Sequence, residues 1–369
     1  MKNCDSQVLK YQRDMVKLSD EDRLDIKDKA DTNRERLKGG LRAAEKPKPI
    51  GMHTQGSYSM KTMIQEEDRD YDIDDGVYFN KEDLVGPNGG EMSALAVRQM
   101  VCNALQDSRF NQPPEVRKNC VRVYYNDGYH VDVPSYRKIE IKDPISGEPK
   151  TAWELAGPTW KRSDARAVTV WFKTANSTRC SDASKDGNRG QFVRVTRLMK
   201  KFAKSRASWK PRTISGFAIS RLVEECYLEI RSRNDQAFRT VMQQIHDRLE
   251  LNDEIAHPTL NGENIVDSGN AKVAFFKDCL KENLEHTGNP RRSGLHARTG
   301  HEGVGQGVQF RTGSGRNLIP TPRRKSTAER RPARSSSRAR HVTLATTGAL
   351  DSTVHGISRA RHRRLVRHP

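Results

Sequence analysis

The sequence predicts an α/β domain built around an acidic centre, followed by a second domain made of helices. Runs with strand alternation and turn residues lie between about residues 72 and 133. Apolar residues then recur at helix spacing from about Gln191 onward. Strands followed by helices, in a chain of 369 residues, indicate two domains. We place these domains at 1–180 and 181–289, with a tail at 290–369.

A charged helix is expected first, over residues 19–38, because Ser19 or Asp20 can cap its amino end. Gly39–Gly40 should loosen the chain after this helix. The segment 45–49, which contains two prolines, then forms a linker that leads into the strand region.

The strand region begins with residues 72–79. Two further strands, 120–125 and 130–133, are joined by the hairpin turn Asn126-Asp127-Gly128. Between the first strand and the strand at 120–125 lies an amphipathic helix at 94–105. The residues that we expect to be buried on this helix are Leu95, Met100, Val101 and Leu105. Together these elements form an α/β domain with at least three strands.

Four apolar stripes with helix spacing predict the second domain. The stripes are Phe192, Val195, Leu198, Met199 and Phe202; Leu222, Val223, Cys226, Tyr227 and Ile230; Phe238, Val241, Met242, Ile245 and Leu249; and Val273, Phe276, Leu280 and Leu284. Helices that each have one apolar face bury it by packing together.

Composition points to a soluble protein of the cytoplasm. The six cysteines lie far apart without a Cys-x-x-Cys pair, which argues against a zinc ribbon or a disulfide framework. No apolar run approaches the roughly 18 residues of a membrane span. The first residues, 1–14, lack the apolar stretch of a signal peptide. We therefore expect a cytoplasmic protein with no membrane partner.

The tail carries most of the net charge of +19, because residues 290–369 contain 17 Arg and one Lys but few acids. Helical periodicity is also lost there. Three interpretations stay open: an Arg-rich arm that binds nucleic acid through phosphate neutralisation, a solvated tail without function, and the translation of a shifted reading frame. Function is therefore argued from residues 1–289.

Three aspartates on the predicted strands indicate a metal site. Residues two apart in a strand point to the same face, so Asp72 and Asp74 project together. Asp132 lies between two valines on a later strand, and its carboxylate converges with the pair if the strands are neighbours. Such carboxylates repel unless cations lie between them, and two Mg²⁺ ions there would serve phosphoryl or nucleotidyl transfer. The remaining acids of this stretch, Asp68, Asp70 and Asp75, are interpreted as solvated charges.

A Gly-Ser turn precedes the acidic strand. Gly56-Ser57 offers backbone N–H groups and a hydroxyl to a triphosphate. A Gly-Ser pair by itself is a common turn. Its combination with an Asp-x-Asp strand and a third strand Asp is far rarer, and favours a functional site.

These motifs resemble a known family. Gly-Ser, Asp-x-Asp, a third Asp and a helical domain are the pattern of the polymerase-beta-like nucleotidyltransferases. The stretches QGSYSMKT, YDIDDGVYF and HVDVPSYR, with RLMKKF and PRTIS, resemble the bacterial cyclic-GMP-AMP-synthase and dinucleotide-cyclase-like branch, which is related to oligoadenylate synthetase. The resemblance covers roughly residues 20–287. It implies a mixed sheet flanked by helices, with a helical carboxyl-terminal domain.

The resemblance also implies roles for individual residues. The family's catalytic, metal-binding carboxylates match Asp72, Asp74 and Asp132, and its Arg before the third Asp matches Arg122. The Lys that holds the triphosphate matches Lys200, with Thr213 beside it. The segment that cradles the nucleotide consists of Gln55, Gly56, Ser57, Tyr58, Ser59 and Met60.

The activity implied by the resemblance is synthesis of a cyclic di- or trinucleotide messenger in anti-phage defence (CBASS), from ATP, GTP or both, with two Mg²⁺ ions or Mn²⁺ in their place. The product would act on a downstream effector, and regulatory or conjugating partner proteins are expected. One alternative is a linear nucleotidyltransferase acting on RNA, a small molecule or a protein. The other is an inactive fold that binds nucleic acid through its basic tail. Family members continue in a structured end beyond the last helix, whereas the tail here matches nothing in the family.

Overall fold

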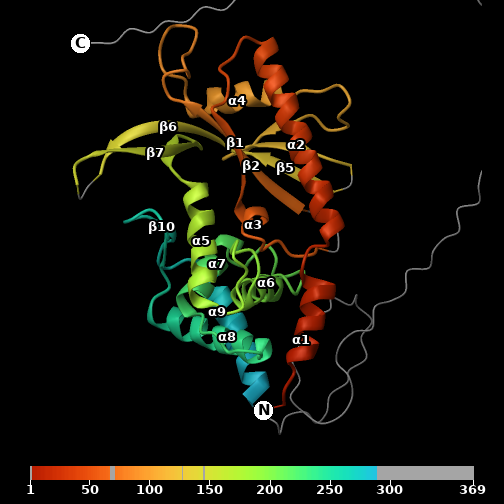
Figure 1. The fold of residues 1–369 in the computed structure, drawn as a ribbon. Helices are drawn as coiled ribbons and strands as arrows, with labels where there is room; N and C mark the ends of the chain where they lie inside the picture. Colours follow the sequence, from red (N-terminus) through yellow and green to blue (C-terminus); the bar gives the residue numbers. More distant parts are fainter. Residues whose placement is uncertain (1, 67–70, 127, 144–145, 289–369) are drawn as a thin grey trace, which may run out of the picture. The chain divides into compact units, whose positions relative to one another are not determined.

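The computed structural model describes residues 2–66, 71–126, 128–143 and 146–288. Its main sheet has the strand order β3-β4-β5-β2-β6-β7-β8, with β1 paired to β2 (Figure 1). The strands are β1 Gly51–Gln55, β2 Tyr71–Asn80, β3 Glu115–Val116, β4 Val121–Tyr124, β5 Tyr129–Val133, β6 Ser135–Lys142, β7 Pro149–Ala156 and β8 Trp160–Arg162. A small two-stranded sheet contains β9 Ile255–Ala256 and β10 Asn264–Val266.

Helices cover the sheet and form a separate helical part (Figure 1). They are α1 Asp5–Tyr11, α2 Asp20–Ala43, α3 Gly56–Ser59, α4 Ala94–Ala104, α5 Ala165–Arg179, α6 Gln191–Ala203, α7 Gly216–Cys226, α8 Asn234–Leu251 and α9 Ala271–Gly288. A π-helical turn, Gln12–Val16, follows α1. No helix in the described ranges is long and apolar enough to cross a membrane.

The central strand β2 has both parallel and antiparallel neighbours, so the sheet is mixed, as predicted. It runs parallel to β5 and β6 and antiparallel to β1. Ile73, Val77 and Phe79 on one face of β2 are fully buried in the core that α2 and α4 close. The other face carries Asp72, Asp74 and Tyr78, because side chains alternate along a strand.

A second core lies in the helical part. It contains the four predicted stripes, on α6, α7, α8 and α9 and just beyond the end of α7. Phe172 of α5 also belongs to this core, and so do Val8 and Val16 near the amino terminus. The first residues of the chain therefore pack on the helical part, whereas α2 packs on the sheet.

Two local expectations were wrong. Helix α2 does not loosen at Gly39–Gly40 but continues to Ala43. A Cβ at Gly40 would lie 2.0 Å from the carbonyl oxygen of Ala104, so glycine lets α2 approach α4 closely. Leu95 is 55% exposed rather than buried, and Ala94 and Val97 are the buried residues of that first turn. Met100, Val101 and Leu105 are buried as predicted.

Candidate active site

The strand register brings the three aspartates together. Strands β2 and β5 are parallel neighbours, with Asp74 opposite Asp132 and Asp72 opposite His130. The Asp72 side chain is half exposed, whereas that of Asp132 is only 12% exposed. The carboxylates therefore project from adjacent strands on the face of the sheet opposite the α2–α4 core.

Arg122 is the cation of this cluster. It lies on β4 opposite Asp132, and its Nε and one terminal nitrogen each donate to an Asp132 oxygen at 2.8 Å. The same nitrogen lies 3.2 Å from Asp72 Oδ1. The hydrogen bonds that Arg122 donates to Asp132 raise the pKa of Arg122 further above its usual range. The arginine thus offsets part of the repulsion among the carboxylates.

Asp74 is the most perturbed of the three carboxylates. Burial, and then the charges of Asp132 and Asp72, raise the pKa of Asp74 to about 7, although Arg122 and Lys200 oppose the shift. A buried carboxylate beside two others is costly unless a cation neutralises it. Carboxylate oxygens are the ligands that Mg²⁺ prefers. The chemistry of these donors therefore suits a divalent cation, although the oxygens of the three aspartates do not all lie within 4.8 Å of one another in the described structure.

The Gly-Ser turn lies directly against Asp74. Gly56 has φ +60, and a Cβ at this position would lie 2.1 Å from Asp74 Oδ2. Glycine is thus required both by the backbone conformation and by the close approach of the carboxylate. Ser57 is half-buried beside it, and its hydroxyl has no hydrogen bond to another described residue.

The other side chains of the predicted cradle hold the turn in place. The Gln55 amide donates to the Tyr136 hydroxyl at 2.8 Å and accepts from the Tyr78 hydroxyl at 3.1 Å. The Ser59 hydroxyl donates to the backbone of Thr54 at 2.7 Å. Tyr58 is buried in the core of the sheet part and Met60 in the core of the helical part. Any nucleotide contact in this segment therefore rests on Ser57 and on backbone N–H groups.

Lys200 approaches the turn from α6. Its Nζ donates to the Thr62 hydroxyl at 2.7 Å, and the side chain is buried. Burial, and then the nearby Lys204 and Arg197, lower the pKa of Lys200 to about 7. Thr213 is also buried, and its hydroxyl has no partner among the described residues.

The sequence analysis did not predict the hydrogen bonds that basic side chains at the carboxyl end of α6 donate to the segment after the turn. Arg197 donates to the Lys61 carbonyl, Lys201 to the Gln65 carbonyl and Lys204 to the Glu66 carboxylate. Together with Lys200, these cations occupy one face of α6, because residues three and four apart are neighbours on a helix. The spacing of the four basic residues in RLMKKFAK was the signal that could have revealed this contact.

The interpretation of Asp75 as a solvated charge was wrong. Asp75 is only 4% exposed and accepts from Arg34 Nε at 2.8 Å, which ties β2 to α2. As its neighbour Asp74 faces the acidic cluster, alternation turns Asp75 toward α2. Asp68 and Asp70 lie outside the described residues.

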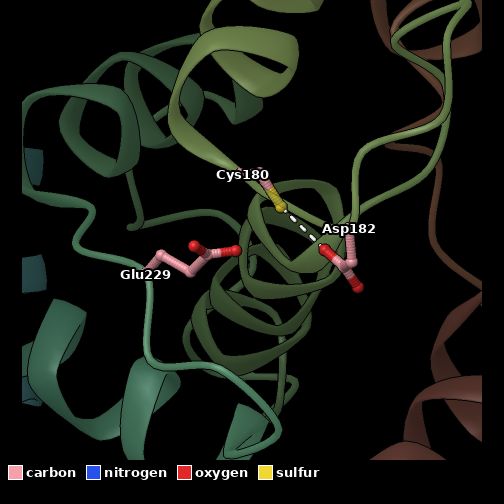
Figure 2. Close-up of side chains that lie close together, drawn as sticks. All are labelled: Cys180, Asp182 and Glu229. Atoms are coloured by element: carbon pink, nitrogen blue, oxygen red, sulfur yellow. Dashed lines mark hydrogen bonds between the residues drawn. The ribbon is translucent and has the colours of Figure 1, made fainter.

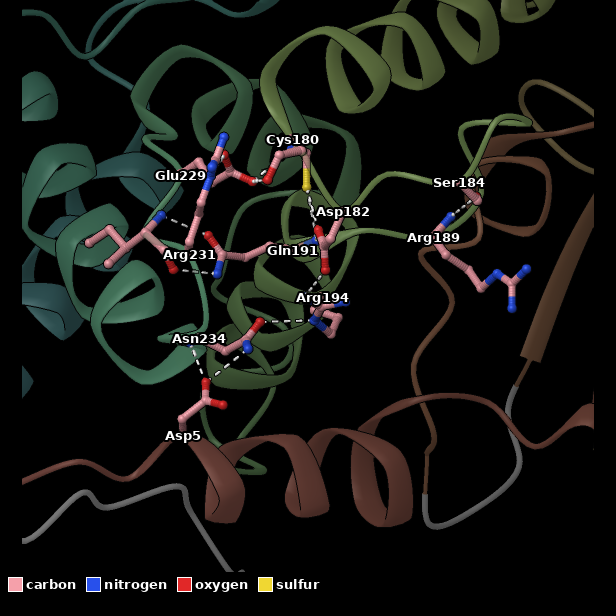
Figure 3. A network of polar contacts seen from close by, with 12 residues as sticks. Asp5, Cys180, Asp182, Ser184, Arg189, Gln191, Arg194, Glu229, Arg231 and Asn234 are labelled. Atoms are coloured by element: carbon pink, nitrogen blue, oxygen red, sulfur yellow. Dashed lines mark hydrogen bonds and ion pairs between the residues drawn. The ribbon is translucent and has the colours of Figure 1, made fainter.

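A second polar cluster lies in the helical part, where Cys180, Asp182 and Glu229 bring ligand-type atoms within 4.8 Å of one another (Figure 2). The Cys180 thiol donates to Asp182 at 2.8 Å. The Glu229 carboxylate accepts from the backbone and hydroxyl of Ser181, both at 2.6 Å. Arg194 continues the network from Asp182 to Asn234 and Asp5 (Figure 3). The polar atoms of the cluster thus form hydrogen bonds with one another and with neighbouring residues, and these bonds hold the loop between α5 and α6 in place.

Comparison with known proteins agrees with this geometry. Residues 51–136, which include the Gly-Ser turn and all three aspartates, match the model of the nucleotidyltransferase domain of cyclic GMP-AMP synthase DncV-like proteins. The site described above thus lies within the segment that is similar to this family. The predicted resemblance is confirmed, and the chain is a nucleotidyltransferase.

Solved structures extend the likeness beyond this domain. Vibrio cholerae DncV in its apo form superimposes with a TM-score of 0.58 at 15% identity, over 77% of this chain and 89% of that chain. The Bradyrhizobium diazoefficiens CD-NTase CdnG, solved with GTP, gives 0.57 at 13% identity, over 76% and 90%. Escherichia coli DncV, in its 3′-deoxy GTP bound form, gives 0.56 at 16% identity, over 73% and 86%. These matches confirm the predicted fold, including its helical part.

Proposed function

We propose that this nucleotidyltransferase links nucleoside triphosphates, ATP or GTP, into a cyclic di- or trinucleotide messenger. The observation that carries the proposal is the convergence of Asp72, Asp74 and Asp132 on neighbouring strands beside Ser57 and Lys200. The DncV-like domain and the nucleotide-bound relatives support the choice of substrate.

In the proposed reaction, the Ser57 hydroxyl and the Lys200 ammonium hold the donor triphosphate. Lys200 then exchanges its bond to Thr62 for a phosphate oxygen, and the new anionic partner favours its charged form. Asp72, Asp74 and Asp132 would hold divalent cations, Mg²⁺ or Mn²⁺. Such ions lower the pKa of an attacking hydroxyl and neutralise the leaving pyrophosphate.

The acceptor hydroxyl attacks the α-phosphorus of the donor. A new O–P bond forms, the bond to the bridging oxygen of the pyrophosphate breaks, and the hydroxyl proton passes to solvent. A second attack of the same kind, by a hydroxyl of the linear intermediate, closes the ring. Arg122 would keep the Asp132 carboxylate oriented through two hydrogen bonds.

The biological setting follows from the same likeness. We propose a cytoplasmic role in anti-phage signalling, in which the cyclic product reaches a downstream effector. A regulatory partner is part of the proposal, because CdnC of Escherichia coli MS115-1, similar in fold, was solved as a CdnC:HORMA-deltaN complex.

Incubation with all four nucleoside triphosphates and Mg²⁺ or Mn²⁺, followed by mass spectrometry, tests the proposal. A cyclic product resists alkaline phosphatase because it has no terminal phosphate. A phosphatase-sensitive product would instead identify a linear nucleotidyltransferase. If no nucleotide is incorporated with either metal, the remaining alternative is an inactive fold that binds nucleic acid.

A further inference from the structure

Four cations gather beside the Gly-Ser turn, on elements far apart in the sequence. Arg23 comes from α2, Lys61 follows the turn and Arg197 lies on α6. Lys173 of α5 lies near enough for its charge to act on Lys61. The Tyr58 ring connects two of them, because the Arg23 guanidinium carbon lies 3.8 Å and the Lys61 ammonium 5.7 Å from its centroid. Arg197 Nε joins the group by donating to the Lys61 carbonyl at 2.6 Å.

Within the described part of the chain, no carboxylate forms an ion pair with any of these four side chains. Two acids act electrostatically on the group, Asp20 on Arg23 and Arg197 and Asp186 on Lys61, and both have other partners. Asp20 pairs with Lys17 at 2.8 Å, and Asp186 accepts from the Ser184 hydroxyl at 2.6 Å. The cluster thus keeps several positive charges together without a matching number of negative ones.

Burial and like charge disfavour the charged forms of two of these groups. Burial, followed by the charges of Arg23 and Lys173, lowers the pKa of Lys61 to about 8. Burial, followed by Arg23, lowers the pKa of Arg197 to about 10. The pKa of a cationic side chain falls in this way where no anion offsets the effects of desolvation and like charge.

The backbone at the centre of the cluster is also strained. Lys61 has φ +58, a left-handed conformation that residues with a Cβ seldom adopt. The amides on either side are fixed, since the Lys61 N–H donates to the Tyr58 carbonyl and the Thr62 N–H to the Ser57 carbonyl. Backbone strain of this kind, held by surrounding contacts, is concentrated at functional sites.

We propose that Arg23, Lys61, Lys173 and Arg197 form a binding site for a phosphate group, separate from the triphosphate position at Ser57 and Lys200. The site offers two guanidinium and two ammonium groups, and groups of these two kinds donate hydrogen bonds to phosphate oxygens in proteins. The phosphate belongs to free inorganic phosphate or to a nucleotide. Because Lys61 precedes Thr62, the partner of Lys200, an occupied site would also steady the turn that carries Ser57.

The test is the melting temperature of the full chain against phosphate concentration, at constant ionic strength maintained with chloride. Two variants remove one charge each. Lys61→Asn keeps a residue that tolerates the left-handed conformation, and Lys173→Gln changes a side chain that has no hydrogen bond in the described structure. Lys118→Gln is the matched control, because Lys118 is exposed on the distant turn before β4.

Inorganic phosphate should raise the melting temperature of the parent in a saturable way, by about 2 to 4 °C at ten times the dissociation constant. Both cluster variants should lose at least half of this rise, while Lys118→Gln keeps it. Without phosphate, Lys173→Gln should melt no lower than the parent, because repulsion has been relieved. A parallel titration with AMP identifies the source of the phosphate, since a nucleotide site responds to AMP at lower concentration.

Lys200→Ala separates the two positions and needs no measurement of activity. If the proposal holds, this variant retains the response to inorganic phosphate. If Lys200→Ala abolishes the response while Lys61→Asn and Lys173→Gln retain it, phosphate binds at the triphosphate position and the proposal fails. A parent that responds equally to chloride and phosphate also overturns it.

Discussion

Replacing Asp74 by Asn should stabilise the metal-free protein while abolishing nucleotide incorporation. Asp74 is the buried member of the acidic cluster, and its pKa is raised from 3.8 to about 7. A shift of about three units, at about 1.4 kcal/mol per unit, corresponds to about 4 kcal/mol of lost stability when the group is charged. The Asn amide must still be buried, so we expect a net gain of about 2 kcal/mol.

The pH dependence of this gain follows from the sign of the shift. Between pH 4 and pH 7 the folded state holds a proton on Asp74 that the unfolded state has already released, so stability falls as pH rises. The advantage of Asp74→Asn should therefore be small near pH 4, grow up to about pH 7, and then stay constant. For a domain of this size the full gain corresponds to roughly 4 to 8 °C in melting temperature.

Differential scanning calorimetry from pH 5 to pH 8 in EDTA, with the same series in Mg²⁺, measures both effects. Magnesium should stabilise the parent more than the variant, because one ligand has been removed. Asp75→Asn is the control one residue away. It breaks the buried pair with Arg34 and should cost about 3 kcal/mol. An Asp74→Asn protein that melts below the parent at pH 8 without metal, or whose advantage does not vary with pH, would refute the reasoning.

Three further predictions follow from the geometry. Gly40→Ala should lower the melting temperature by several degrees, because the new methyl group would lie 2.0 Å from the Ala104 carbonyl; Gly39→Ala, with open space around it, should not. Lys200→Ala should raise the Michaelis constant for the triphosphate more than it lowers turnover, and a collapsed turnover at unchanged Michaelis constant would give Lys200 another role. Deletion of residues 290–369 should leave nucleotide incorporation intact, since both cores and the acidic cluster precede it, and an inactive trimmed protein would contradict the proposed boundary.

The sequence by itself determined on which faces of the strands and helices the candidate site residues and the core residues lie. The alternation of apolar residues and aspartates predicted that Asp72 and Asp74 share a face, because a strand turns every second side chain to the same side, and the register of β2 and β5 places Asp132 beside them. Helix periodicity identified the four stripes of the helical core for the same reason, with a different period. These predictions needed only local geometry, which the chain carries along its length.

Only the tertiary structure decided which distant residue meets each of these side chains. Asp75 is an ion-pair partner of Arg34 across 41 positions, and Lys200 reaches Thr62 across 138. Gly40 lies inside a continuous helix, although the Gly39–Gly40 pair predicted a break there. A glycine is needed at this position because the neighbouring helix α4 approaches too closely for a side chain. A periodic pattern states which side of an element is buried, but it carries no information about the segment that covers that side. That segment is set by the packing of the whole chain, where burial and charge pairing between remote residues outweigh local preference.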